Sequence, residues 1–193
     1  MNPVIIRDTR DKPGKHENVD RYLAEQGYQI VRSKLYVGDV SLLHDQRTCI
    51  DLKQGLGEVE GNLTSQHERF RRECQKAQEA GIRLIVLAEE PGIQELDGVR
   101  GWRNPRRSRW NKIDREHSCG RMLHIHISPR PPIDGKIMAD IMETMTERYG
   151  VEWQFCGKNQ TGERICEILG LAHGPSMPES SGSGCRPGHF VSR

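Results

Sequence analysis

The chain has 193 residues, of which 34% are hydrophobic and 29% are charged. This mixture is typical of a water-soluble globular protein, and it excludes a wholly disordered or membrane-embedded chain. The length favours one domain with a single core. The net charge is only +2, so a surface that binds a polyanion must come from local clusters of basic residues.

The sequence contains neither a recognisable secretion signal nor a membrane span. Its first residues lack a basic start followed by a long apolar stretch, and no run of about eighteen apolar residues occurs. We therefore expect a cytoplasmic protein without a membrane partner. Its six cysteines include no C-x-x-C pair, so we expect reduced, structural thiols.

The first part of the chain predicts a strand, a helix and a hairpin. A short apolar run at residues 3–8 is strand-like, and apolar residues at helical spacing follow at 15–26, before Gly27. The β-rich stretches 28–43 and 47–53 are joined by the polar residues HDQR, which is the pattern of a hairpin.

Further helices and strands follow the hairpin. Ser65 and Glu68 form a capping box at the start of a helix, which ends at Gly81 before the unbroken apolar run of a buried strand at 82–88. A helix capped by Asp134 has a stripe of methionines that we expect in the core. The remaining elements are a strand at 123–127, a strand at 151–156 and a short helix at 161–169.

Strands and helices therefore alternate along the chain, which predicts an α/β fold with a mixed β-sheet flanked by helices. We expect a single domain at residues 1–170. A basic loop without periodicity interrupts it at 91–121, and the low-complexity residues 171–193 form a flexible tail.

The hairpin has charged residues where the strand pattern is otherwise apolar. Alternation sends Asp51 and Lys53 to one face of the strand, while Ile50 and Leu52 point into the core. Asp39 then lies roughly opposite Asp51 on the partner strand. One interpretation is a solvated strand face without a function; the other is a functional site.

Two carboxylates held this close repel each other unless a proton or a cation lies between them. Hard oxygen ligands suit Mg²⁺ or Mn²⁺, which lower the pKa of bound water and neutralise charge on phosphate. Lys53 could then orient or deprotonate the water, or stabilise the transition state. Other acidic residues expected nearby are Asp8 and Asp11 after the first strand, and Glu58 and Glu60 after the hairpin.

Three sequence blocks resemble those of a known nuclease family. DTRD at 8–11, GD at 38–39 and IDLK at 50–53 are similar in order and spacing to the D-x-R-E, G-D and E-R-K blocks of the XPF-like nucleases, in the PD-(D/E)XK superfamily. The resemblance spans residues 4–90. It continues more weakly in WRNPR and TMTERYGVEWQFC, which look like phage and prophage members.

The resemblance implies a restriction-endonuclease-like fold and Mg²⁺-dependent hydrolysis of DNA. It implies that Asp8, Asp39 and Asp51 approach the metal and that Lys53 is the catalytic lysine. It also implies a homodimer through the nuclease domain, and action on single-strand, flap or junction DNA in repair, recombination or phage DNA processing, within a bacterial or phage-infected cell.

Three departures separate the chain from the family pattern. Leu52 replaces the arginine of the E-R-K block, and Asp51 replaces its glutamate but keeps a carboxylate. Gly57 stands where the family has an acidic residue, and Glu58 comes one place late. No tandem helix-hairpin-helix motif is visible, so the family's choice of substrate structure cannot simply be inherited.

Basic residues gather on one helix and in the loop. Arg69, Arg72 and Lys76 recur at helical spacing and could contact phosphates, or form an ordinary solvated face. The loop mixes arginines with tryptophans, which suits phosphate contacts and stacking on bases, although a disordered insertion without function has the same composition. The loop residues assigned to nucleic-acid binding are Trp102, Arg103, Arg106, Arg107 and Trp110.

A further group of histidines and a cysteine has the chemistry of zinc ligands but not a familiar spacing. It comprises His117, Cys119, His124 and His126. The two later histidines are more simply polar positions on an alternating strand.

Taken together, these residues predict a Mg²⁺- or Mn²⁺-dependent endonuclease that hydrolyses DNA phosphodiester bonds. One alternative is an inactive nucleic-acid-binding module of the same fold. Another is a restriction-type enzyme, whose base-reading side chains a single sequence cannot reveal.

Overall fold

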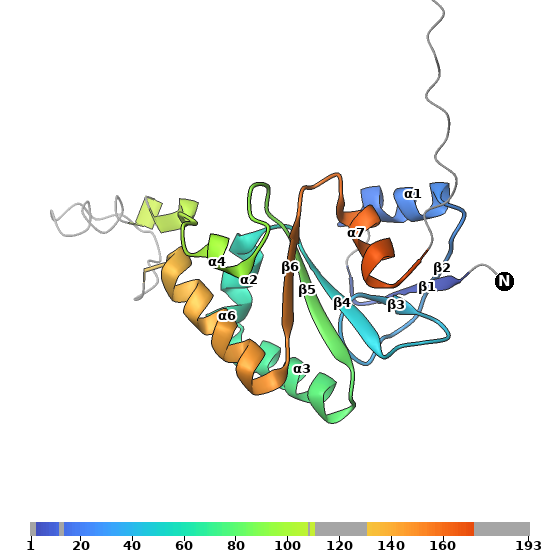
Figure 1. Cartoon of the computed structure of the whole chain (residues 1–193), viewed down its shortest axis with the longest axis horizontal. Coiled ribbons are helices and arrows are strands. Elements are labelled where there is room, and N and C mark those ends of the chain that lie inside the picture. Colours follow the sequence, from blue (N-terminus) through green and yellow to red (C-terminus); the bar gives the residue numbers. More distant parts are fainter. Residues whose placement is uncertain (1–2, 12–13, 108, 111–130, 172–193) are drawn as a thin grey trace, which may run out of the picture.

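The computed structural model describes residues 3–11, 14–107, 109–110 and 131–171. They form one six-stranded sheet with helices on both faces (Figure 1). The strands are β1 (Val4–Arg7), β2 (Gln29–Arg32), β3 (Val40–Leu42), β4 (Thr48–Lys53), β5 (Arg83–Glu89) and β6 (Glu152–Cys156). The helices are α1 (Glu17–Glu25), α2 (Leu56–Leu63), α3 (His67–Glu79), α4 (Leu96–Val99), α6 (Gly135–Tyr149) and α7 (Thr161–Ile168). The predicted α/β fold with a mixed sheet is confirmed.

One of the six strands runs against the others. The strand order is β2-β1-β3-β4-β5-β6. β3 is antiparallel to its neighbours β1 and β4, whereas the pairs β1–β2, β4–β5 and β5–β6 are parallel. One end of the sheet therefore holds the C-terminal ends of β1, β4 and β5 together with the start of β3. Functional sites of α/β proteins tend to lie at this end of the sheet.

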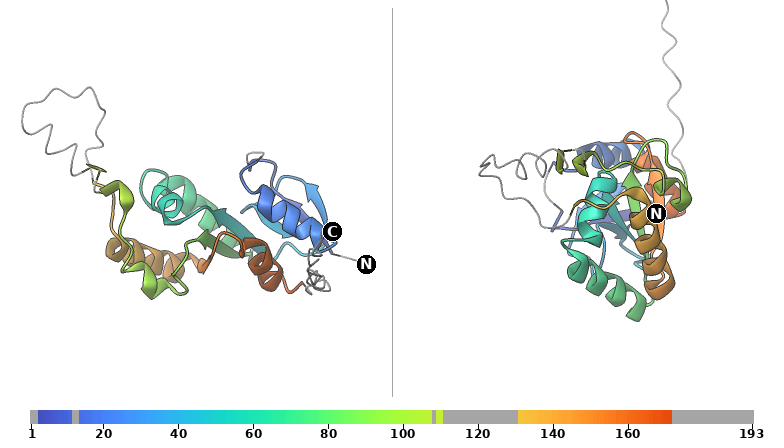
Figure 2. Two further views of the ribbon diagram at one scale, coloured as in Figure 1. Left: turned by 90° about the horizontal axis from the view of Figure 1, so that it is seen from above. Right: turned by 90° about the vertical axis from the view of Figure 1, so that its left-hand side faces the viewer.

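Two apolar cores lie on opposite faces of the sheet. α2, α3, α4 and α6 cover one face, where Phe70 of α3 packs in a cluster with Val86 of β5. α1 and α7 cover the other face, where Leu23 of α1 packs in a cluster with Ile50 and Leu52 of β4. The two groups of helices lie on either side of the strands in Figure 1 and in the left-hand view of Figure 2.

The longest sequence patterns predicted their elements correctly. β5 is buried from Leu84 to Glu89, as its unbroken apolar run predicts. Asp134 caps α6, because its side chain accepts a hydrogen bond from the Ile137 N–H. The methionines on the inner face of α6 are buried in the core.

The β-rich stretch at residues 28–43 is two strands and not, as predicted, one half of a hairpin. β2 pairs in parallel with β1 at the edge of the sheet, and only β3 forms the hairpin with β4. The chain between them bends at residues 36–39, where Gly38 has a φ of 72°. Both halves are rich in β-formers, so the apolar pattern alone does not reveal the break.

The predicted capping box is wrong. α3 begins at His67, because α2, which the sequence pattern did not predict, occupies the residues before it. The hydroxyl groups of Thr64 and Ser65 donate instead to the carbonyl oxygens of Glu60 and Gly61 at the end of α2. These residues close one helix rather than open the next.

Some predicted features lie outside the described residues. They are residues 111–121 of the basic loop, the strand at 123–127, the histidine and cysteine group, and the tail beyond Leu171. Within the described ranges, no helix is long and apolar enough to span a membrane.

Gly38 should be intolerant of a side chain, because a Cβ atom there would lie 3.1 Å from the Ile50 carbonyl oxygen and its φ is 72°. We expect Gly38→Ala to lower the free energy of unfolding by about 1–2 kcal/mol or more, measured by urea denaturation. Gly61→Ala is the control, because a Cβ atom in the interior of α2 meets nothing within 4 Å. It should raise stability by up to about 1 kcal/mol. Equal stability of Gly38→Ala and the wild type would contradict this assignment.

Candidate active site

The carboxylates of Asp39 and Asp51 in the β3–β4 hairpin lie at the end of the sheet where β1 and β4 finish. Val40 of β3 pairs with Ile50 of β4, so Asp39 just before the one and Asp51 just after the other are neighbours across antiparallel strands. The Asp39 N–H donates to the Ile50 carbonyl oxygen at 2.8 Å. The Leu52 N–H donates to Asp39 Oδ2 at 2.8 Å. Backbone pairing therefore fixes the Asp39 carboxylate beside β4.

Asp51 and Lys53 form a buried ion pair on β4. Lys53 Nζ donates to Asp51 Oδ1 at 2.5 Å, and the two residues are 8% and 5% exposed, respectively. They follow Cys49 on the face covered by α2 and α3, while Ile50 and Leu52 lie in the opposite core, as alternation predicts. The interpretation as a solvated strand face is therefore wrong.

The charges at the site are mutually dependent. Burial, together with the negative charge of Asp51, raises the pKa of Asp39 to about 7, although Lys53 and the Leu52 N–H oppose the shift. Burial alone would lower the pKa of Lys53, but the charges of Asp51 and Asp39 outweigh it and raise that pKa. Lys53 is therefore an ammonium group at neutral pH.

The carboxylate oxygens of Asp39 and Asp51 are suitable ligands for a hard divalent cation. Asp51 Oδ2 is buried and has no hydrogen-bond partner, although a buried carboxylate oxygen normally has one. The Asp39 carboxylate lies next to it, with a pKa that partial burial and the charge of Asp51 raise. No group of three His, Cys, Asp or Glu side chains among the described residues is arranged to hold a metal. A cation here would therefore complete its shell with water or phosphate oxygens, as Mg²⁺ usually does.

Asp8 lies at the same end of the sheet, but its carboxylate already accepts hydrogen bonds from neighbouring residues. It is fully buried, and its oxygens accept hydrogen bonds from the backbone N–H, Nε and Nη2 of Arg10 and from the Leu35 N–H. Burial would raise the pKa of Asp8, but these hydrogen bonds outweigh it and lower that pKa. The Asp8 N–H also donates to the Asp39 carbonyl oxygen at 2.8 Å. These hydrogen bonds of Asp8 join the end of β1 to the segment before β3. The contact of Asp8 with a metal stays a prediction.

The other acidic residues proposed for the site also have partners. Asp11 pairs with Arg7, with 2.7 Å between Oδ2 and Nη2. Glu58 accepts from Lys15 Nζ and from the backbone N–H of Gln54. Both therefore support the loops around the carboxylate pair.

Glu60 lies away from the carboxylate pair. Its carboxylate binds Arg106 of the basic loop and accepts from the Ile133 N–H at 3.3 Å. Glu60 therefore ties α2 to the segments before and after the undescribed residues of the loop.

Glu73 is a site residue that the sequence pattern missed. Its Oε1 accepts a hydrogen bond from the Gly38 N–H at 3.1 Å, directly before Asp39. Its charge also favours the protonated form of Lys53. The signal for it was weak, since Glu73 is one acidic residue between the basic residues of α3.

Arg10 is a second residue near the site for which the sequence predicted no role, although it is part of the DTRD block. Arg10 forms an ion pair with Asp8, and its guanidinium also interacts with the charges of Glu73 and Asp39. An arginine beside the carboxylates, with its side chain 54% exposed, is well placed for an incoming phosphate.

Of the three basic residues predicted on α3, Arg69 contacts a residue of this site. Arg69 donates to Gln66 Oε1 and Asn62 Oδ1, and its Nη1 lies 3.8 Å from Glu73 Oε2. Arg72 donates from Nε to the Glu68 carbonyl oxygen. Arg72 and Lys76 are exposed. Arg69 is therefore linked through Glu73 to Gly38, the residue before Asp39.

The described loop residues mostly make internal contacts. Trp102 packs against the core under α2, α3 and α6, and Arg103 is exposed. Arg106 binds Glu60, and Arg107 binds the carbonyl oxygen of Pro132 and the carboxylate of Asp134. Their roles in nucleic-acid binding stay predictions.

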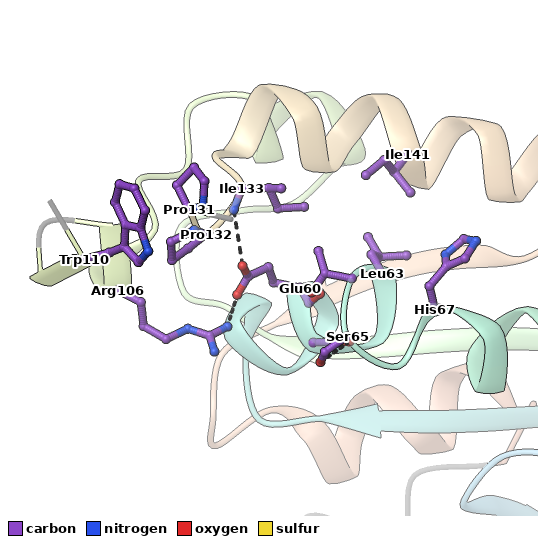
Figure 3. A pocket seen from close by; sticks show the side chains of 12 residues that line it. Glu60, Leu63, Ser65, His67, Arg106, Trp110, Pro131, Pro132, Ile133 and Ile141 are labelled. Atoms are coloured by element: carbon purple, nitrogen blue, oxygen red, sulfur yellow. Dashed lines mark hydrogen bonds and ion pairs between the residues drawn. The ribbon is translucent and has the colours of Figure 1, made fainter. Parts of the chain in front are cut away.

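A cavity of about 880 Å³ lies next to this loop and not at the carboxylates. Trp110, Ile133 and Ile141 line it, together with Glu60 and Leu63 of α2 (Figure 3). Neither Asp39, Asp51 nor Lys53 lines it. We place the site at the C-terminal end of β4, because the buried charges of Asp51 and Lys53 lie there.

The fold is similar to that of XPF from Aeropyrum pernix. The TM-score is 0.53 at 15% identity, with 86% of this chain and 63% of that chain covered. The structure of XPF from Aeropyrum pernix in complex with DNA gives a TM-score of 0.53 at 16% identity, with 87% of this chain and 64% of that chain covered. The chain thus spans less than two thirds of the XPF chain, and at this identity the likeness shows the fold alone. No protein-family model and no curated protein matches the sequence.

The raised pKa of Asp39 predicts a pH-dependent stability in the absence of divalent cations. The folded state binds this proton more tightly than the unfolded chain, whose aspartate pKa is about 3.9. Stability should therefore fall as the pH rises from about 4 towards the folded-state pKa of about 7. In EDTA, thermal unfolding should show Asp39→Asn to be more stable than the wild type at alkaline pH, with the difference vanishing at low pH.

Asp45→Asn is the matched control for this experiment. Asp45 is an aspartate of the β3–β4 turn whose pKa the neighbouring Arg47 lowers to about 2, so it stays ionised over the whole interval. If both variants respond to pH in the same way, the ionised Asp39 carboxylate, half-buried beside Asp51, is not what destabilises the metal-free protein.

Proposed function

We propose that the protein is a Mg²⁺- or Mn²⁺-dependent endonuclease that hydrolyses DNA phosphodiester bonds. The observation that carries the proposal is the half-buried Asp39 beside the buried ion pair of Asp51 and Lys53, where β4 of an XPF-like sheet ends. The similar XPF structure in complex with DNA supports DNA as the substrate. The sequence resemblance supports single-strand, flap or junction DNA in repair, recombination or phage DNA processing, by a homodimer in the cytoplasm of a bacterial or phage-infected cell.

Each residue of the group has a distinct task in this reaction. Asp39 and Asp51 hold the divalent cation, which when bound supplies Lewis-acid stabilisation of the charge that develops on the phosphodiester. Lys53 is held as an ammonium by Asp51, so it acts as a donor to water or phosphate oxygen rather than as a base. Glu73 positions Asp39 through the Gly38 N–H.

The departures from the family blocks do not argue for an inactive binding module. Leu52, in place of the family arginine, is buried in the core under α1 and α7 and therefore points away from the site. Gly57 lies in the first turn of α2, and Glu58 after it is held by Lys15 and Gln54. Asp39, Asp51 and Lys53 are retained, although keeping the charges of Asp51 and Lys53 buried costs stability.

Cleavage assays should detect cutting of labelled DNA by the wild type with Mg²⁺ or Mn²⁺ and none in EDTA. Single-strand, duplex, flap and four-way-junction substrates are compared. Asp51→Ala and Lys53→Ala should each lower the rate by about 100-fold or more, because each removes a charge that acts on the transition state. Asp45→Ala, which changes an exposed aspartate of the β3–β4 turn, should cut at the wild-type rate. Tight binding without cutting by the wild type would instead identify a binding module.

Arg69 should contact a phosphate next to the site. We expect Arg69→Ala to weaken DNA binding and to reduce by about 1 the slope of log affinity against log salt concentration, since one cation fewer is released. Arg47→Ala is the control, because Arg47 lies in the β3–β4 turn, at the end of β3 and β4 that is remote from Asp39 and Lys53. An unchanged slope in Arg69→Ala would exclude the contact.

A further inference from the structure

β6 is an edge strand without the usual protection. It is the last strand of the sheet (Figure 1), and among the described residues no strand or side chain bonds to its outer backbone groups. It pairs with β5 in an unbroken register without a bulge, and it contains neither proline nor lysine. Bulges, prolines and lysines are common means of keeping an edge strand from pairing with another chain. The outer side of β6 can therefore pair with a further strand.

A second cavity, of about 470 Å³, lies along this edge. Its apolar wall consists of Leu96 of α4, Val151 and Trp153 of β6. A strand that is added to a sheet edge points every second side chain to the same face, and pockets beside the edge accept these side chains. An apolar side chain of an added strand can therefore enter the cavity while its backbone pairs with β6.

Gln154 offers this edge a hydrogen-bond acceptor that has no donor. It lies on β6 and lines the cavity, and its Oε1 is buried without a hydrogen-bond partner among the described residues. A buried amide oxygen normally accepts a hydrogen bond. A donor of a bound segment would satisfy it.

The cavity is acidic. It is lined by Glu143, Glu147 and Glu152, and by no lysine, arginine or histidine. Arg83 pairs with Glu152, whereas Arg100 is shared between Glu143 and two aspartates. Glu147 is exposed and has no ion-pair partner among the residues that the structure describes. This surface therefore keeps a negative charge, which attracts a basic partner and repels DNA.

We propose that β6 and this cavity bind an extended segment of a partner protein that carries basic residues around an apolar one. The segment adds to β6 as a further strand, its apolar side chain enters the cavity, and its basic side chains meet the glutamates. A second copy of this chain fits the edge less well. A two-fold interface sets the same patch against itself and would gather the glutamates of both copies. The inference goes beyond the proposed nuclease function and does not rest on it.

Fluorescence anisotropy tests the strand addition. The probe is a short labelled peptide with a central valine between lysines and threonines, and it is titrated with the full chain at physiological salt. The wild type should bind this peptide. It should not bind the same peptide methylated at alternate backbone nitrogens, because that peptide keeps its side chains and charge but cannot pair as a strand.

Two charge variants locate the binding. Glu147→Lys reverses an exposed charge at the cavity and should weaken binding between about two- and thirtyfold, since one attraction becomes a repulsion. Glu25→Lys makes the same change at an exposed position of α1, on the other face of the sheet, and should leave the affinity unchanged. Absence of binding by the wild type, equal binding of the two peptides, or equal weakening by the two variants would overturn the proposal.

Sedimentation of the wild type with and without the peptide tests the rival occupant. We expect the peptide to leave the number of copies in the particle unchanged. A dimer that the peptide dissociates would assign the edge to a second copy and overturn the proposal. A lack of DNA cleavage would contradict the proposed function alone, because none of these measurements depends on cutting.

Discussion

The pairing of Val40 with Ile50 in the β3–β4 hairpin is the constraint on which the candidate site depends. It makes Asp39 and Asp51 neighbours across the two strands. Because side chains alternate along β4, a slip of one residue would turn Asp51 into the core under α1 and α7. The Asp39 carboxylate itself accepts the Leu52 N–H, so this side chain contributes to the register that brings the two carboxylates together.

The same arrangement is unfavourable for a metal-free protein. Burial and repulsion raise the pKa of Asp39 to about 7, while Lys53 compensates only one oxygen of Asp51 and leaves the other without a partner. Surrounding contacts hold the backbone of Asp39 in place: the Asp8 N–H donates to the Asp39 carbonyl oxygen, and the Gly38 N–H donates to Glu73. Functional sites commonly keep such unfavourable groups at a cost in stability.

The part of the site that lies on one hairpin could be predicted from sequence, because strand alternation and antiparallel pairing are local rules. The residues that support it could not. Glu73 and Arg10 reach Asp39 through packing between α3, β1 and the segment before β3, which no periodicity encodes. The position of Ser65 shows the same limit: its capping pattern is real in sequence, but the end of α2 uses its hydroxyl instead.

The proposed function requires that Asp39 and Asp51 together hold a divalent cation. Titration calorimetry with Mn²⁺ tests it most directly, on the wild type, Asp39→Asn, Asp51→Asn and Asp45→Asn. We expect a binding isotherm for the wild type and Asp45→Asn that is lost in both Asp39→Asn and Asp51→Asn. Equal Mn²⁺ binding by all four proteins, or none by the wild type, would contradict it.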